Sequence, residues 1–306
     1  MKQLRSIVVG VDFTPCSATA LGQAVRLARG GGGAARVRAV HTIETLVLEE
    51  VAEIMPPTAV AIVDSVKADA QQAWNEFAPG VDKSGVEFLV LVGNPLAEIL
   101  AQSRGADLLV LGTHGTSPES QGTGTLATRC VRKAPTPVLL VRRSQTGPFR
   151  GVVAAVDFSE TSRLALEAAA EVAVGDGAAL HILHVFEAPW KRLHYRSPTP
   201  EAARDFQKQY SDILARRLEG FAQDVTSRPE VARLGPKFHL VESTSHGVGA
   251  VEFIQKHGCD LACLGTRGRT NLRDVLLGST AERIVRQAPC SILAVKPPDQ
   301  QPGQGE

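Results

Sequence analysis

The chain has 306 residues, which is long enough for two domains of ordinary size. Hydrophobic residues make up 43% and charged residues 21%, a balance typical of globular rather than disordered or fibrous proteins. The 33 lysines and arginines almost equal the 32 aspartates and glutamates, so no net charge favours nucleic acid or an anionic membrane. No uncharged apolar stretch approaches the roughly 20 residues that cross a bilayer, and the run that begins at Ile7 ends at Asp12, too early for a signal peptide. We therefore expect a cytoplasmic protein without nucleic-acid or membrane partners.

Short β-branched runs alternate with longer helical patterns in the first half of the chain. Between the first two runs, Ala20, Leu21, Ala24 and Ala28 mark one apolar face of a helix, and a further helix is expected from about Thr58. Strands that alternate with helices in this way indicate a parallel sheet with crossover helices. The expected strands are residues 6–11, 36–41, 86–92, 107–112 and 137–142.

The second half of the chain repeats the same order of elements. A segment that contains Gly147 and Pro148 separates the halves and predicts a linker. Thr199 followed by Pro200 is typical of a helix start, with threonine as the cap and proline at the first helical position. The expected strands are residues 151–156, 179–185, 238–243, 260–265 and 291–296.

The two halves also share sequence, which indicates that they are copies of one unit. Val-Asp-Phe at residues 11–13 recurs at residues 156–158, and Leu-Gly-Thr at residues 111–113 recurs at residues 264–266. Such self-similarity is the signature of repeated structural units. We therefore predict an α/β protein with two tandem doubly wound domains, each a five-stranded parallel sheet with helices on both faces. The predicted domains are residues 1–146 and 147–298, followed by a disordered tail at residues 299–306.

Candidate ligand-binding residues lie at the carboxyl ends of the strands in the second copy. Asp157 follows the first strand, Val185 ends the second and Gly265 ends the fourth. In an open doubly wound sheet, ligands bind beyond these ends, where the strand order reverses. We therefore expect the three loops to converge on one ligand.

The segment that begins at Gly265 carries the most specific pattern. Gly265 and Gly268 flank two residues, nine residues follow, and Gly278-Ser279 leads into a helix. Glycines let backbone N–H groups approach an anion, and the N-terminus of a helix favours phosphate. An alternative is that the glycines only turn the chain, while Ser279 caps the helix in a capping box with Glu282.

This pattern resembles the nucleotide loop of the universal stress proteins, and the resemblance covers nearly the whole chain twice. The resemblance implies that the loop binds ATP or AMP, with Mg²⁺ as a candidate companion of the phosphates. It assigns the adenosine portion to Asp157 and the backbone of Val185. It assigns the ribose and phosphates to Leu264, Gly265, Gly268, Gly278, Ser279 and Thr280.

The first copy departs from the family pattern in its glycine-rich loop. Only eight residues separate Gly115 from Gly124, and they include Pro118 and Glu119. A shorter and more acidic loop should hold phosphate less well, so we expect this site to be the weaker one. Its candidate residues are Asp12, Gly112, Gly115, Gly124 and Thr125.

Basic residues accompany both sites. Arg267, Arg269 and Arg273 lie in the second loop and could add charge-assisted bonds to phosphate, although we expect most of them to be solvated. His41 and His184 occupy equivalent positions at the ends of the second strands, where we expect a structural role.

The expected function is binding of an adenine nucleotide by a stress-response or regulatory protein, without catalysis. No lysine follows the glycine loop as it does in a P-loop. The sequence also shows no convincing set of acid, base and nucleophile and no cluster of metal ligands. Cys259 and Cys263 lie in one apolar run without a second ligand pair, so we expect core residues. Two alternatives stay open, namely a structural or partner-binding module without nucleotide and a slow ATP-hydrolysing enzyme.

The family resemblance also implies that the two domains pair through their last strands, residues 137–142 and 291–296. Such pairing would cover two edges that otherwise invite aggregation. The sequence leaves open whether two chains then form a homodimer.

Overall fold

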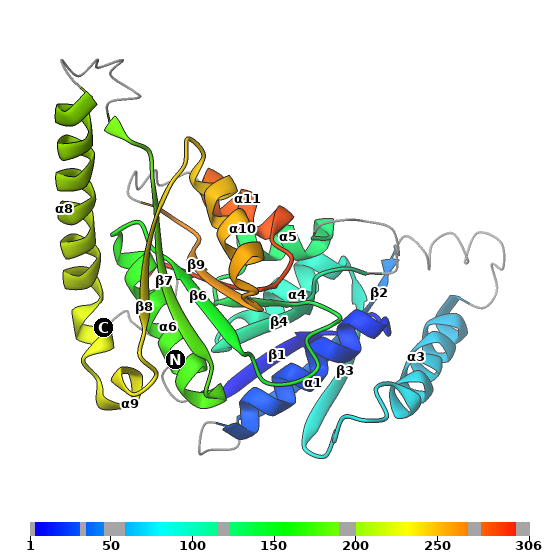
Figure 1. Ribbon diagram of the computed structural model, residues 1–306. Coiled ribbons are helices and arrows are strands. Elements are labelled where there is room, and N and C mark those ends of the chain that lie inside the picture. The colour runs from blue at the N-terminus through cyan, green and yellow to red at the C-terminus, as the bar shows by residue number, and fades with distance from the viewer. Residues whose placement is uncertain are drawn as a thin grey trace, which may run out of the picture. The chain divides into compact units, whose positions relative to one another are not determined.

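The chain folds into two compact units, Lys2–Gly147 and Pro148–Pro298, which we call the N-terminal and the C-terminal unit (Figure 1). The computed structural model describes residues 4–30, 35–45, 59–115, 123–189, 200–268 and 277–297.

The N-terminal unit contains a parallel sheet in the strand order β3-β2-β1-β4-β5. Its strands are β1 (Ser6–Gly10), β2 (Arg36–Glu44), β3 (Val86–Gly93), β4 (Leu108–Gly112) and β5 (Val138–Val141). Its described helices are α1 (Pro15–Gly30), α3 (Ala59–Glu76), α4 (Pro95–Ser103) and α5 (Thr125–Lys133).

The C-terminal unit repeats this topology in the order β8-β7-β6-β9-β10, again with every pair parallel. Its strands are β6 (Gly151–Ala155), β7 (Ala179–Phe186), β8 (Lys237–Glu242), β9 (Leu261–Gly265) and β10 (Ser291–Val295). Its described helices are α6 (Glu160–Asp176), α8 (Pro200–Thr226), α9 (Pro229–Ala232), α10 (His246–His257) and α11 (Ser279–Gln287). The predicted fold class is therefore confirmed.

The central strands are apolar on both sides, as a sheet covered by helices on two faces requires. Ile7 and Val8 on β1 point to opposite sides of the sheet and are both buried, and so are Val152 and Val153 on β6. The strand order reverses beside β1 and β6, and crossovers between parallel strands are right-handed. Helices before the reversal therefore cover one face and helices after it cover the other.

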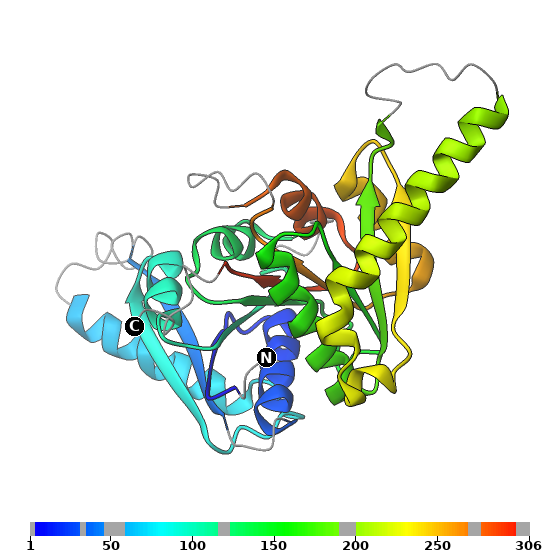
Figure 2. The ribbon, with the colours of Figure 1, turned by 90° about the vertical axis from the view of Figure 1, so that its left-hand side faces the viewer.

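In the C-terminal unit this rule separates two helical layers. α6 contacts α8 and α9, whereas α10 contacts α11, and both layers pack on the sheet. The views in Figures 1 and 2 show α8 as a long helix beside β8, with which it is in contact. Neither unit has, within its described residues, a helix long and apolar enough to cross a bilayer.

Two aspartates, each just before the fourth strand of its unit, hold the starts of the central strands. The Asp107 carboxylate accepts the N–H groups of Arg5 and Ser6 at 2.8 and 2.9 Å. In the same way, Asp260 accepts the N–H groups of Arg150 and Gly151. These bonds fix β1 and β6 at the ends opposite to the candidate sites.

Cys259 and Cys263 are core residues, as expected from their apolar surroundings. Their exposed fractions are 5% and 0%, and neither forms a disulfide. Burial raises the pKa of the Cys259 thiol to about 11 and raises that of Cys263 further, so both thiols are protonated at neutral pH.

Candidate functional site

A cavity of about 720 Å³ lies at the carboxyl ends of β6, β7 and β9 in the C-terminal unit. The strand order reverses between β6 and β9, so the cavity occupies the switch point at which such sheets bind ligands. The eight residues predicted for the main site all line it: Asp157, Val185, Leu264, Gly265, Gly268, Gly278, Ser279 and Thr280. Further lining residues include Ser162, His184, His246, Ala250, Thr266 and Arg267.

The first turn of α11 presents backbone donors to this cavity. Gly278 is the N-cap and makes no side-chain capping bond, so the alternative that Ser279 caps the helix is wrong. The first intrahelical bond is made by the N–H of Glu282 to the carbonyl oxygen of Gly278 at 2.8 Å. The amides of residues 279–281 therefore precede the intrahelical ladder and, with the helix dipole, favour an anion.

The two loop glycines lie where a side chain would collide with its neighbours. A Cβ atom on Gly268 would stand 2.8 Å from Oδ2 of Asp157. A Cβ atom on Gly265 would stand 2.9 Å from Cγ2 of Thr161 on α6. Gly265 is thus required for close approach to the backbone of α6, and Gly268 leaves room for the Asp157 carboxylate.

The Asp157 carboxylate is oriented by the turn that follows β6. Its Oδ1 atom accepts the backbone N–H of Ser159 at 3.0 Å and the hydroxyl of Ser159 at 2.5 Å. Ser159 also caps α6, because its hydroxyl oxygen accepts the N–H of Ser162 at 3.2 Å. These bonds hold Oδ1 and leave Oδ2 beside Gly268.

Phe158 adopts a backbone conformation that bulky residues rarely take. Its φ is +66°, in the left-handed region, and the same is true of Phe13 at +59° in the N-terminal unit. Such a conformation costs on the order of 1–3 kcal/mol and persists only where the surroundings impose it. The Phe158 ring packs on His184 at 4.3 Å, and the Arg217 guanidinium lies 4.3 Å above it.

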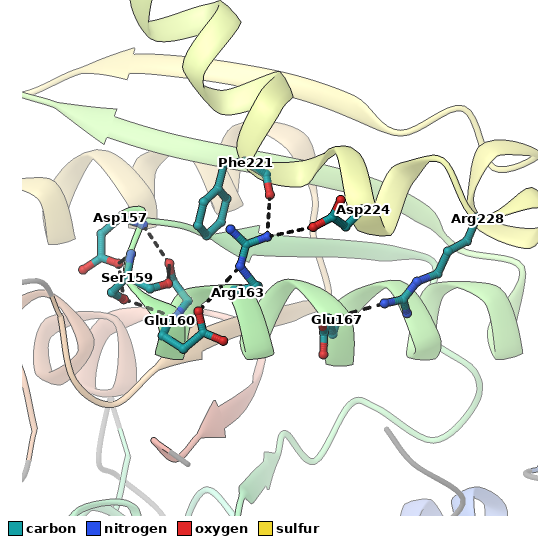
Figure 3. A network of polar contacts seen from close by, with 9 residues as sticks. Asp157, Ser159, Glu160, Arg163, Glu167, Phe221, Asp224 and Arg228 are labelled. Atoms are coloured by element: carbon teal, nitrogen blue, oxygen red, sulfur yellow. Dashed lines mark hydrogen bonds and ion pairs between the residues drawn. The ribbon is translucent and has the colours of Figure 1, made fainter. Parts of the chain in front are cut away.

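Figure 3 shows how the start of α6 is attached to α8 beside Asp157. Arg163 donates to the carbonyl oxygen of Phe221 at 3.1 Å and lies 3.7 Å from Asp224 and 3.6 Å from Glu160. Its guanidinium also stacks on the Phe221 ring at 4.5 Å. This network fixes the first turn of α6, and with it the turn that orients Asp157.

His184 lines the cavity and joins the ends of two strands. Its Nδ1–H donates to the carbonyl oxygen of Val156 at 2.8 Å, and His41 makes the equivalent bond to Val11 at 2.9 Å. Burial lowers the pKa of His184, so the ring is neutral at pH 7. This repeated bond fits the structural role expected for both histidines.

The N-terminal unit brings several residues of the weaker predicted site together in a similar way. Asp12 Oδ1 accepts the N–H and hydroxyl of Thr14 at 3.1 and 2.6 Å, and a Cβ atom on Gly115 would stand 3.2 Å from Asp12 Oδ2. Gly112 lies against Cys16, because a Cβ atom on Gly112 would stand 3.0 Å from Sγ of Cys16. Gly124 caps α5, which begins at Thr125.

Some predicted features fall outside the described residues. They include the acidic stretch with Pro118 and Glu119, the helix cap Thr199, and Arg269 and Arg273 of the second loop. Arg267 is described and lines the cavity. Sequence reasoning did not anticipate His246, the first residue of α10, which also lines the cavity.

The fold and the cavity define an α/β protein of two similar units, with a ligand-sized cavity at the switch point of a doubly wound parallel sheet. The sequence profile of the universal stress protein family matches residues 3–142 and 148–296. The chain therefore belongs to the universal stress protein family, as its sequence pattern indicated.

Individual relatives agree with this assignment. A universal stress protein of Mycobacterium tuberculosis is 26% identical over 318 aligned positions that cover 95% of each chain. One from Methanocaldococcus jannaschii is 50% identical over 48 residues, which span 16% of this chain and 28% of that protein. Among solved structures, a universal stress protein from Archaeoglobus fulgidus matches 96% of this chain and 99% of its own, with a TM-score of 0.58 and 19% identity. At this identity the likeness shows the fold alone.

Proposed function

We propose that the C-terminal unit binds an adenine nucleotide, ATP or AMP, in the cavity beside Asp157. The observation that carries this proposal is the uncapped first turn of α11, which lines the cavity together with Gly265 and Gly268. Backbone N–H groups at a helix start, together with the positive end of the helix dipole, favour a phosphate. The cavity volume of about 720 Å³ lies within the usual range for small-molecule sites.

The polarity of the lining suggests how the nucleotide is oriented. Leu183 and Val185 form an apolar wall suited to the base, and Oδ2 of Asp157 can accept a ribose hydroxyl. Arg267 and Gly268 follow the end of β9, and Ser279 begins α11; these three residues suit the phosphates. Mg²⁺ would accompany a triphosphate through the phosphate oxygens.

We propose a second, weaker site for a polar ligand in the N-terminal unit. The positions equivalent to Val185 and Arg267 are Thr42 and His114. Among the described residues, Thr42 Oγ1 and His114 Nε2 are buried without a hydrogen-bond partner. Since buried polar atoms in native proteins are almost always paired, both atoms suit a ligand at the place where the C-terminal unit has its cavity.

The proposed role is that of a cytoplasmic, non-catalytic stress-response protein. Occupancy of its nucleotide site would change its stability or its binding to partners. Ser159 holds Oδ1 of Asp157 and Val156 holds Nδ1 of His184, so both side chains are fixed in the wall of the cavity. The described residues contain no group of three His, Cys, Asp or Glu side chains arranged to hold a metal ion. Ligand at 100 times its Kd would stabilise the folded unit by about 2.7 kcal/mol. We still predict that the units associate through β5 and β10. We also still predict that two chains can form a homodimer.

Mass spectrometry of gently purified protein tests this function. We expect acid treatment to release ATP, ADP or AMP at close to one nucleotide per chain, because the cavity holds one ligand. We also expect added ATP to be hydrolysed at less than one turnover per minute.

Two results would contradict the proposal in different ways. Hydrolysis at several turnovers per minute would favour an enzyme. An empty or lipid-loaded chain that fails to bind added millimolar ATP would favour a structural or partner-binding module.

A further inference from the structure

Three histidines from different elements of the C-terminal unit form a compact group, which we call the histidine cluster. It consists of His181 on β7, His239 on β8 and His257 at the end of α10. The ring centroids lie 5.1 Å apart for His181 and His239, 5.8 Å for His181 and His257, and 5.3 Å for His239 and His257. The Nδ1 atom of His181 and the Nε2 atom of His239 form a hydrogen bond at 3.0 Å.

The histidine cluster attaches the C-terminal end of α10 to the sheet. Phe253 of α10 stacks on His257 at 3.9 Å and packs on His239 at 4.7 Å. His257 Nδ1 donates to the Phe253 carbonyl oxygen at 3.0 Å. His181 is buried, with 8% of its surface exposed, whereas His257 is exposed. The aromatic packing therefore joins a solvent-accessible histidine to a buried one.

The charged groups around the histidine cluster are basic. The charges that act on His181 belong to His239 and Lys237 on β8 and to His257 on α10, and none of these groups is a carboxylate. The same His257 and Lys237 act on His239. Glu252 and Lys256, the other charged residues of α10, are exposed to solvent.

A resident metal ion does not explain the histidine cluster. No arrangement of three His, Cys, Asp or Glu side chains among the described residues is suited to hold one. The His181–His239 pair is instead satisfied by a hydrogen bond between the two rings. Such a bond needs an N–H on one ring and a lone pair on the other.

The same elements that carry the histidine cluster also form the wall of the proposed nucleotide cavity. β7 carries His181 and, three and four residues later, His184 and Val185. α10 contributes His246 to the cavity, and a Cβ atom on its Gly249 would stand 2.9 Å from Cγ1 of Val185. α10 therefore packs tightly on the cavity wall at one end and on the histidine cluster at the other.

We propose that the histidine cluster is an acid-sensitive switch, which holds α10 on the sheet at neutral pH, loosens it in mild acid and thereby weakens ligand binding in the cavity. The coupling to the cavity rests on the proposed nucleotide-binding function, whereas the loosening of α10 does not.

Protonation explains the switch at the level of single atoms. With one proton added to the pair, His239 Nε2–H still donates to the lone pair of neutral His181. A second proton puts N–H groups on both facing nitrogens and adds a positive charge beside Lys237 and His257. The hydrogen bond between β7 and β8 is then replaced by repulsion, which also acts on His257 and loosens the packing of α10 on the two rings.

The sign of the pH dependence follows from burial. Burial, followed by the charges of His239, His257 and Lys237, lowers the pKa of His181 from 6.5 to about 4. The folded unit therefore takes up this proton less readily than the unfolded chain. The contribution of neutral His181 to the stability of the folded unit is complete above about pH 6.5. It is lost as the pH falls from 6.5 towards 4.

The N-terminal unit supplies a matched internal control. The position of His181 is occupied by Arg38, which forms an ion pair with Glu87 at 2.9 Å instead of a histidine pair. α4, the counterpart of α10, therefore lacks this dependence on histidine protonation. The two helices can be compared in the same sample.

Hydrogen exchange followed by mass spectrometry tests the switch without any ligand. After correction for intrinsic exchange rates, we expect the protection of α10 relative to α4 to fall about tenfold between pH 7.5 and 5.0. The double variant His181→Phe/His239→Phe removes both hydrogen-bond partners together and keeps two rings. In this variant the protection of α10 relative to α4 should not change with pH. An unchanged ratio in the wild type, or an equal fall in the double variant, would overturn the proposal.

A second variant and a ligand titration complete the test. His257→Gln lies at the exposed edge and should reduce the fall in protection, so it keeps the test valid if the double variant does not fold. ATP affinity should fall at least fivefold more in the wild type than in the double variant between pH 7.5 and 5.5. If α10 loosens but this difference is absent, regulation of the cavity is excluded. If ATP binds at neither pH, the proposed function fails while the exchange result on α10 still decides the switch.

Discussion

Replacing Gly268 with aspartate should weaken ATP binding by the C-terminal unit roughly 100-fold, which corresponds to about 2.7 kcal/mol. A Cβ atom at this position would stand 2.8 Å from Oδ2 of Asp157, whose other oxygen is held by Ser159. The new carboxylate would also place a negative charge where we expect phosphate, and like charges at this distance repel. Isothermal titration of ATP at fixed salt measures the loss.

Two matched variants separate the causes of this effect. Gly268→Asn has nearly the same size without the charge, so it should lose less affinity than Gly268→Asp. Gly115→Asp makes the equivalent change in the N-terminal unit, where a Cβ atom would stand 3.2 Å from Asp12 Oδ2, and it should leave the stronger site intact. Equal ATP affinity in wild type and Gly268→Asp would remove the proposed site.

Replacing Gly265 with valine should destabilise the C-terminal unit by about 3 kcal/mol, at the upper end of the cost of overpacking. A Cβ atom there would lie 2.9 to 3.1 Å from the side chain and backbone of Thr161. The added methyl groups must therefore push the first turn of α6 away from the end of β9. Urea unfolding, with hydrogen exchange to assign each transition to a unit, measures the change.

Gly220→Ala on α8 is the control for this substitution. Nothing lies within 4 Å of a Cβ atom at that position, so alanine should raise the stability of the C-terminal unit by roughly 0.5–1 kcal/mol through its helix propensity. A Gly265→Val protein as stable as the wild type would show that the loop does not lie against α6.

The sheet topology and the composition of the main site could be predicted from sequence because both depend on local patterns. Ile7, Val9 and Val152 belong to runs that only a strand covered on both faces tolerates, and they are fully buried. The repeat of Val-Asp-Phe and of the glycine-rich loop placed Asp157 and Gly268 at strand ends. Parallel topology then brought those ends to one edge of the sheet, where both residues line the same cavity.

Other features of the site depend on contacts between distant segments, which a sequence pattern does not reveal. β2 continues to Glu44, beyond the predicted end at residue 41, because β3 pairs with it as far as Gly93. The left-handed Phe158 is imposed by its packing on His184 and by the Asp157 turn. Sequence reasoning therefore missed both.

The histidine cluster was missed for a similar reason. The start of α11 was not missed, because the helix begins at Ser279, directly after Gly278, as the Gly278-Ser279 pair indicated. The members of the histidine cluster are separated in sequence, and only the pairing of β7 with β8 and the packing of α10 bring them together.

A structure of the protein crystallised with ATP tests the central claim most directly. We predict electron density for the phosphates within hydrogen-bond distance of the backbone N–H groups of Gly268, Ser279 and Thr280, with the ribose beside Asp157. Density for the nucleotide elsewhere, or a loop whose N–H groups point away from the phosphates, would contradict the account.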